Sequence, residues 1–382
     1  MVSAGTSPVE PRPLRIFLEP GYDGGRVGAW MLDLPGALAH AATRERAISN
    51  GLSMAGLVRE WIEDHGDDAG QPPFHWAEVA EEIPSAPTAD GRGRRVTFEA
   101  ERRAVTDADR ETVLRRLGWA RDDLRGVAAR VDAWTAVHGE LPGNEADREA
   151  REPEAVLRHL AAAETRLAGR LGGSPYPARL GIAPLEEELA ATRAWALAAV
   201  RTRHASVGAD ELTDERGESW TVAKVLRRMA CHAFDHLREL EHRLARVDGS
   251  ADRVQVTLAR RPAAHEVLEL LRSVGWDYYL EEPEAFGRAL EATDEVAAAW
   301  DGDRLVGLAR SITDGHRNAF LATVIVHPAW QGLGVGERVM AALMDGRDGV
   351  RFALSAASGM DDWYRKLGFV PDPHAMVRRR PR

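Results

Sequence analysis

The N-terminal residues alternate apolar and polar positions and then change to a helical spacing. Residues 14–18 and 27–32 show the two-residue period of strands, and Gly24 and Gly25 between them suit a hairpin turn. Apolar residues then recur on one face over residues 44–65, which predicts a helix capped by Thr43. We expect loop structure over residues 71–94 and a closing strand near residues 95–100.

Residues 104–247 have a helical pattern throughout. Amphipathic helices are expected near residues 106–131, 153–171, 184–205 and 221–246. Pro153 and Pro184 fall in first helical turns, where proline is tolerated. Four such helices in sequence predict a four-helix bundle.

After a linker near residue 248, strand and helix patterns alternate. Strands are expected at residues 254–258, 296–300, 305–311, 320–326, 350–355 and 374–379, and helices at residues 265–274, 283–292, 337–345 and 361–366. This alternation is typical of an α/β domain. The chain as a whole is predicted to be a multidomain α+β protein, with domains at residues 1–103, 104–248 and 249–382.

Composition narrows the classes of function. The formal net charge of -10 argues against a general nucleic-acid binder, which needs a basic face. No run of about 18 apolar residues is present, so we expect no membrane span. The lone Cys231 excludes an intramolecular disulfide and a cysteine-rich zinc site. The N-terminus lacks the apolar core of a signal peptide, and we expect a cytoplasmic protein.

A glycine-rich turn lies between a strand and a helix in the last third of the chain. The predicted strand at 320–326 is followed by Gln331, Gly332, Leu333, Gly334, Val335 and Gly336, and then by the helix. This order places free backbone N–H groups at a helix N-terminus, where anions bind. No Gly-Lys-Ser/Thr follows, so the turn is not a Walker loop, and its third glycine comes too early for a dinucleotide fingerprint.

Residues 326–336 resemble the acetyl-CoA loop of the GNAT acetyltransferase superfamily. Residues 305–310 resemble its central hairpin strand, and residues 363–369 its C-terminal Leu-Gly-Phe signature. The resemblance covers about residues 252–380. It implies an α/β domain with a mixed central sheet, acetyl-CoA as cofactor, and direct attack of an amine on the thioester. A small-molecule amine is the expected acceptor.

The same resemblance implies roles for single residues. The backbone groups of Val324 and Val326 would pair with the pantetheine arm, and an N–H near Ile325 would polarise the thioester oxygen. Backbone N–H groups of residues 331–336 would hold the pyrophosphate. Tyr364 matches the position that protonates the leaving thiolate; its alternative role is to pack against the cofactor arm.

The general base stays open. Relatives often carry an acidic residue near the position of Thr323. The threonine of this chain cannot serve as a base. The remaining candidates are a water chain, Glu281, Glu282 and His327.

Three histidines in the helical segment suit a metal. His232 and His236 are four residues apart and so share one helix face, and His159 lies on another predicted helix. A merely packed or solvated pair is the alternative. Residues 159–164 and 230–237 resemble the DinB/YfiT-like bundle family. That resemblance implies a divalent metal, zinc or nickel, and a metal-dependent thiol transferase or isomerase as the competing function.

The N-terminal segment carries a third resemblance. Residues 14–18, 33–36 and 43–47 are similar to the HicB-like ββαβ fold. In antitoxins this fold binds a toxin, so a protein partner at this domain is one expectation. A purely structural role is the other. The non-enzyme alternative is therefore an antitoxin-like binding or sensor protein.

Overall fold

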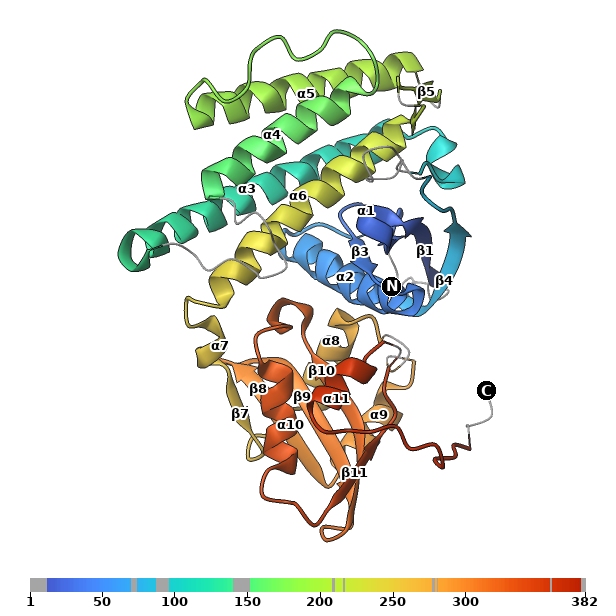
Figure 1. Cartoon of the computed structure of the whole chain (residues 1–382), viewed down its shortest axis with the longest axis vertical. Helices are drawn as coiled ribbons and strands as arrows, with labels where there is room; N and C mark the ends of the chain where they lie inside the picture. Colours follow the sequence, from blue (N-terminus) through green and yellow to red (C-terminus); the bar gives the residue numbers. More distant parts are fainter. Residues whose placement is uncertain are drawn as a thin grey trace, which may run out of the picture.

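A computed structural model describes residues 12–69, 74–86, 96–139, 152–207, 210–215, 217–276, 279, 281–357 and 359–378. Three layers follow one another along the long axis of the molecule (Figure 1). Long helices form one end, the N-terminal sheet with its helix lies in the middle, and the C-terminal sheet domain forms the other end. Among the described residues, no helix has both the length and the apolarity to cross a bilayer.

The middle layer is a four-stranded sheet of order β3-β2-β1-β4. Strands β1 (Arg12–Gly21) and β2 (Arg26–Trp30) form the predicted antiparallel hairpin across the short helical turn α1 (Tyr22–Gly25). Strand β3 (Leu38–Ala41) then pairs with β2. Helix α2 (Arg44–Asp64) begins as predicted, because the Thr43 hydroxyl accepts a hydrogen bond from the Arg46 N–H.

The fourth strand of this sheet corrects two predictions. Strand β4 (Phe74–Glu82) runs parallel to β1 inside the stretch predicted as loop. It is an edge strand, and its many glutamates hid it from the apolar pattern. The predicted closing strand near residues 95–100 is absent from residues 96–100. Instead Phe98 is buried, and its N–H is bound by Glu101 at the start of the 3-10 turn η1 (Glu99–Arg102).

Four long helices pack side by side in the next layer. They are α3 (Asp107–His138), α4 (Pro153–Gly169), α5 (Leu185–Val207) and α6 (Val222–Ala245). A short hairpin, β5 (Leu212–Thr213) with β6 (Ser219–Trp220), precedes α6. One buried apolar cluster includes Ile16 of β1, Val58 of α2 and Phe234 of α6. The hydrophobic core is therefore continuous across the predicted boundary at residue 103.

The C-terminal domain has a five-stranded sheet of order β11-β10-β9-β8-β7. The parallel pair of β10 and β11 beside antiparallel neighbours gives the predicted mixed sheet. Its strands are β7 (Gln255–Thr257), β8 (Glu295–Asp301), β9 (Arg304–Thr313), β10 (Asn318–Val326) and β11 (Arg351–Leu354).

Helices cover both faces of this sheet. Helices α8 (Ala264–Ser273) and α9 (Pro283–Glu291) pack on one face. Helices α10 (Val335–Met344) and α11 (Asp361–Lys366) pack on the other, and the short helix α7 (Ser250–Arg253) leads into β7. The strand predicted at 374–379 is wrong for residues 374–378, which are exposed and unpaired with any described strand; residue 379 lies outside the described residues.

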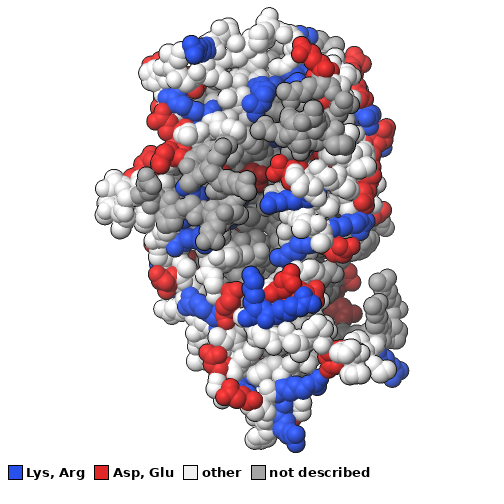
Figure 2. Space-filling view, viewed as in Figure 1, with Lys and Arg blue, Asp and Glu red and all other residues white. Residues whose placement is uncertain are grey.

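Helix α2 lies directly against the C-terminal domain (Figure 1). A Cβ atom at Gly56 would lie 2.1 Å from the carbonyl oxygen of Ser273, the last residue of α8. One turn of α2 therefore packs backbone against backbone. The Arg59 guanidinium adds a 2.9 Å hydrogen bond to the carbonyl of Arg272. Figure 2 shows acidic and basic side chains interspersed over one face, with several gathered where these parts meet.

The contact at Gly56 predicts a destabilising Gly56→Ala substitution. In an open helix interior this change stabilises by about 1 kcal/mol, but here the methyl group clashes with a carbonyl, and overpacking costs about 1–3 kcal/mol. We expect a lower melting temperature in thermal unfolding. Gly126→Ala in α3 is the matched control, because nothing lies within 4 Å of its Cβ position, and it should stabilise. Equal stabilisation by both substitutions would contradict the close approach.

Candidate functional site

Strands β10 and β11 separate along their length. They pair only from Asn318 to Leu321 with residues 351–354, and β10 then continues to Val326. The N–H of His327 donates to the carbonyl of Val306 in β9 over 2.9 Å. Because peptide groups alternate in direction along a strand, those of Ile325 also face β9, whereas those of Val324 and Val326 face the side that β11 leaves open.

The loop after β10 ends at a helix N-terminus. The 3-10 turn η3 (Pro328–Trp330) leads to Gly332 with φ 73° and Gly334 with φ 77°, both left-handed conformations that favour glycine. Helix α10 begins at Val335, and its first-turn N–H groups have no partner within the helix. A Cβ at Gly336 would lie 3.0 Å from the Trp363 ring, so this glycine permits a close approach.

Tyr364 lies on α11 beside this loop. Its ring centroid is 4.8 Å from that of Trp363 and 5.8 Å from that of Phe369. Burial raises the pKa of Tyr364, because the phenolate is the charged form. The hydroxyl is protonated at neutral pH, so it has a proton to donate.

Comparison with known sequences identifies this arrangement. The acetyltransferase (GNAT) domain family matches residues 292–371, which include β10, the glycine loop and Tyr364. The C-terminal segment is a GNAT acetyltransferase domain. It places an acyltransferase domain at the end of the chain, as the sequence predicted.

Two curated relatives share parts of the GNAT domain. Serotonin N-acetyltransferase 2, chloroplastic, of Oryza sativa subsp. japonica is 37% identical over 102 residues, covering 25% of this chain and 51% of that protein. The uncharacterized N-acetyltransferase ycf52 of Porphyra purpurea is 41% identical over 73 residues, covering 18% of this chain and 42% of that protein. The chain thus spans about half the length of these relatives.

A solved structure covers a similar portion. A GNAT-family acetyltransferase of Streptococcus pneumoniae shares 25% sequence identity, and the match covers 34% of this chain and 99% of that protein, with a TM-score of 0.30.

His327 is fully engaged and therefore does not fit the role of general base. Its side chain is buried, and burial lowers its pKa even though Glu60 is close. Its Nδ1 accepts the N–H of Ala329 over 3.2 Å, so Nε2 carries the proton and donates to Glu60 over 2.6 Å. Glu281 and Glu282 are exposed at the start of α9, and they remain candidates together with a water chain.

The structure brings the three predicted histidines together between α4 and α6. The Nε2 atom of His232 lies 3.1 Å from the Nε2 atoms of both His159 and His236. One ring nitrogen from each histidine lies within 4.8 Å of the others. The Nδ1 atom of His236 is 2.8 Å from a carboxylate oxygen of Glu239.

This donor set fits a divalent metal. A tetrahedral metal bound at 2.0–2.1 Å would hold neighbouring nitrogens about 3.3 Å apart, close to the observed spacing. Burial, with the nearby charges of His236 and His159, lowers the pKa of His232 to about 2, so it is a neutral imidazole, the form that binds metals. Glu239 would orient His236, as carboxylates commonly do for metal-ligating histidines.

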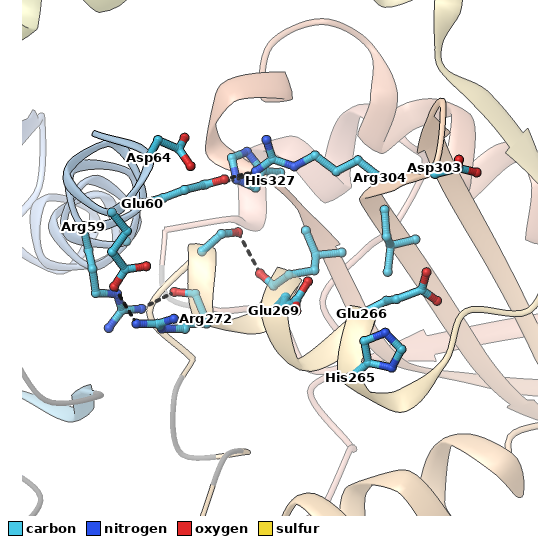
Figure 3. Close-up of a pocket in the computed structure, with 15 residues that line it drawn as sticks. Arg59, Glu60, Asp64, His265, Glu266, Glu269, Arg272, Asp303, Arg304 and His327 are labelled. Carbon is cyan, nitrogen blue, oxygen red and sulfur yellow. Dashed lines mark hydrogen bonds and ion pairs between the residues drawn. The ribbon is translucent and has the colours of Figure 1, made fainter. Parts of the chain in front are cut away.

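A cavity of about 550 Å³ lies beside the contact of α2 with α8, near the start of the loop (Figure 3). Charged side chains from both parts of the chain line it. Glu60 of α2 points across to His327 and Arg304 of the GNAT domain. Sequence reasoning missed Glu60, because its partner His327 is 267 residues away and no local pattern joins them.

Proposed function

We propose that this protein is an acetyl-CoA-dependent N-acetyltransferase that acts on a small-molecule amine. One observation carries the proposal. The open edge of β10 at Val324 and Val326 leads within five residues to a loop with two left-handed glycines at the N-terminus of α10. An extended arm beside a diphosphate group matches these two features in the same order.

Two parts of acetyl-CoA would lie along these features. The amide groups of the pantetheine arm would pair with the peptide groups of Val324 and Val326 as an added strand. The pyrophosphate would accept hydrogen bonds from backbone N–H groups in residues 331–336. Because the Ile325 N–H faces β9, we assign no thioester contact to it.

The chemistry is a direct transfer. The amine nitrogen attacks the thioester carbonyl carbon, a C–N bond forms and the C–S bond breaks. Tyr364 gives its phenolic proton to the departing thiolate sulfur, and the proton of the amine passes to water or to Glu281 or Glu282. The position of Tyr364 on α11, beside Trp363, which contacts the loop at Gly336, supports this role.

The loop conformation predicts that Gly334→Ala weakens binding of coenzyme A. An alanine with left-handed φ costs about 1–2 kcal/mol and would shift the N–H groups of the loop. Gly346→Ala is the matched control, because Gly346 has φ 74° and open space at Cβ but lies beyond the far end of α10. In calorimetric titration with coenzyme A, we expect lower affinity for Gly334→Ala only. A wild-type protein without measurable binding would overturn the proposed function.

The proton-donor role predicts a slower Tyr364→Phe variant. Phenylalanine keeps the ring contacts with Trp363 and Phe369 but cannot donate a proton. We expect kcat to fall about 100-fold and KM for acetyl-CoA to stay within about twofold. The fall in rate at high pH, where the tyrosine ionises, should disappear. An unchanged kcat with a raised KM would show that Tyr364 only packs against the cofactor arm.

A second candidate function rests on His159, His232 and His236. We propose that they bind a divalent metal, zinc or nickel, in a DinB/YfiT-like helical domain. The convergence of three ring nitrogens from two helices supports this proposal. Such a metal leaves positions open for a thiol or water, which would suit a metal-dependent thiol transferase or isomerase.

Two histidine variants, one at the site and one away from it, test the metal proposal. Wild-type protein should bind about one equivalent of zinc or nickel, and chelator should lower its melting temperature. His232→Ala should abolish both effects, whereas the exposed His138→Ala in α3 should keep them. Metal analysis of the purified protein and thermal unfolding measure the two quantities. Equal metal content in both variants would contradict the site.

The HicB-like assignment of the N-terminal sheet is a further part of this proposal. The order β1, β2, β3, α2 and β4 supports it in part, because it adds the strand β3 to the predicted ββαβ order. Part of α2 is already covered by the GNAT domain at Gly56, which favours a structural role within the chain over an antitoxin-like docking role. A protein partner at this domain is the alternative.

A further inference from the structure

Side chains from outside the GNAT domain contact the acetyl-CoA loop at two points. Glu60 of α2 binds His327, the residue directly before η3. His242 of α6 lies with its Nε2 atom 3.1 Å from the carbonyl oxygen of Gln331, the residue directly after η3. We propose that Glu60 and His242 are positioning residues for acetyl-CoA binding. This inference rests on the proposed acetyltransferase function.

Glu60 holds a cluster at the start of the loop. One carboxylate oxygen accepts from His327 Nε2 over 2.6 Å, and the other pairs with Arg304. The His327 ring lies edge-on to Trp330 with centroids 4.9 Å apart, and the Arg304 guanidinium lies 5.0 Å from the centroid of the same indole. Both partners of Glu60 thus contact Trp330, the last residue of η3.

Burial makes this contact costly to lose. Only 4% of the His327 side chain is exposed, so its Nε2–H has little access to water and needs an acceptor. Without Glu60 this N–H loses its carboxylate acceptor and faces the Arg304 guanidinium, 3.0 Å away, which is itself a donor. A ring rotation that relieves this contact would change the packing of His327 against Trp330 and so disturb the turn that follows.

His242 restrains the other end of the turn. A Cβ at Gly332 would lie 3.0 Å from its Nε2 atom, so the imidazole lies directly against the glycine backbone. Gln331 in turn donates its side-chain amide to the carbonyl of Val326 over 3.0 Å. His242 is therefore linked through Gln331 to Val326 at the open edge of β10.

Other contacts of the same interface do not touch the loop. Glu63, one turn along α2 from Glu60, pairs with Arg272 of α8 over 2.8 Å. Its removal weakens docking of α2 and leaves His327 and Trp330 untouched. A Glu63 variant therefore tests the attachment of α2 without changing the contacts that position the loop.

Calorimetric titration of the full chain with coenzyme A tests the inference. We expect Glu60→Ala to raise Kd about tenfold, with an equal rise in KM for acetyl-CoA and kcat within about twofold. Glu60→Gln should recover most of the affinity, because its amide oxygen can accept from His327. Glu63→Ala should bind like the wild type. His242→Ala should also raise Kd, with Glu241→Gln on the same helix as its control.

A double-variant cycle adds a readout that a merely structural role would not move. If Glu60 acts through His327, the pair Glu60→Ala and His327→Ala should bind coenzyme A no more weakly than His327→Ala alone. Should Glu60→Ala fail to fold, Glu60→Asp replaces it, because its carboxylate is one methylene shorter and falls short of His327.

Each outcome decides between the two proposals. Wild-type affinity in Glu60→Ala, or an equal loss in Glu63→Ala, overturns the positioning role while the acetyltransferase stands. Absence of coenzyme A binding by the wild type overturns both.

Discussion

The packing of α2 against the end of α8 is the constraint on which the arrangement of the candidate site depends. Gly56 has no side chain, so the helix backbone lies directly against the carbonyl of Ser273. From that contact α2 extends one turn to Glu60, which meets His327 after β10, and in the other direction to Arg46, which contacts Met360 before α11. These positions are about 21 Å apart along the helix axis. One helix of the N-terminal segment thus reaches both sides of the separated strands β10 and β11.

Helix α6 connects the other parts in the same way. It carries His232 and His236 of the candidate metal site and, six residues after His236, His242 at the acetyl-CoA loop. That separation is about 9 Å along the axis. Because α6 also belongs to the apolar cluster shared with β1 and α2, the first two segments share one core. The GNAT domain has apolar clusters of its own and contacts that core through α2 and His242.

Local patterns predicted what depends on local sequence. The strand, glycine loop and helix around Gly334 follow from a contiguous stretch, and so does the cap at Thr43. Strand β4 was missed because its pairing partner is distant and its exposed face is acidic. The sequence also did not predict which way the Ile325 peptide group faces. The pairing of β10 with β9 decides which peptide groups of β10 point toward β9. Glu60 and His242 act on residues 267 and 89 positions away, which no periodicity records.

The family signature identifies a candidate acid but no base, and this difference has a physical reason. Tyr364 is held by packing within the GNAT domain, between Trp363 and Phe369, so the family signature brings the acid with it. A base must instead suit the acceptor. An amine with a lysine-like pKa of about 10.4 is neutral in only about one molecule in 2,500 at pH 7, whereas one with a pKa near 8 is neutral in about one in ten. With both nitrogens of His327 engaged, the demand on Glu281, Glu282 or water is set by the amine itself. The acceptor, and not the fold, therefore decides how strong a base this site requires.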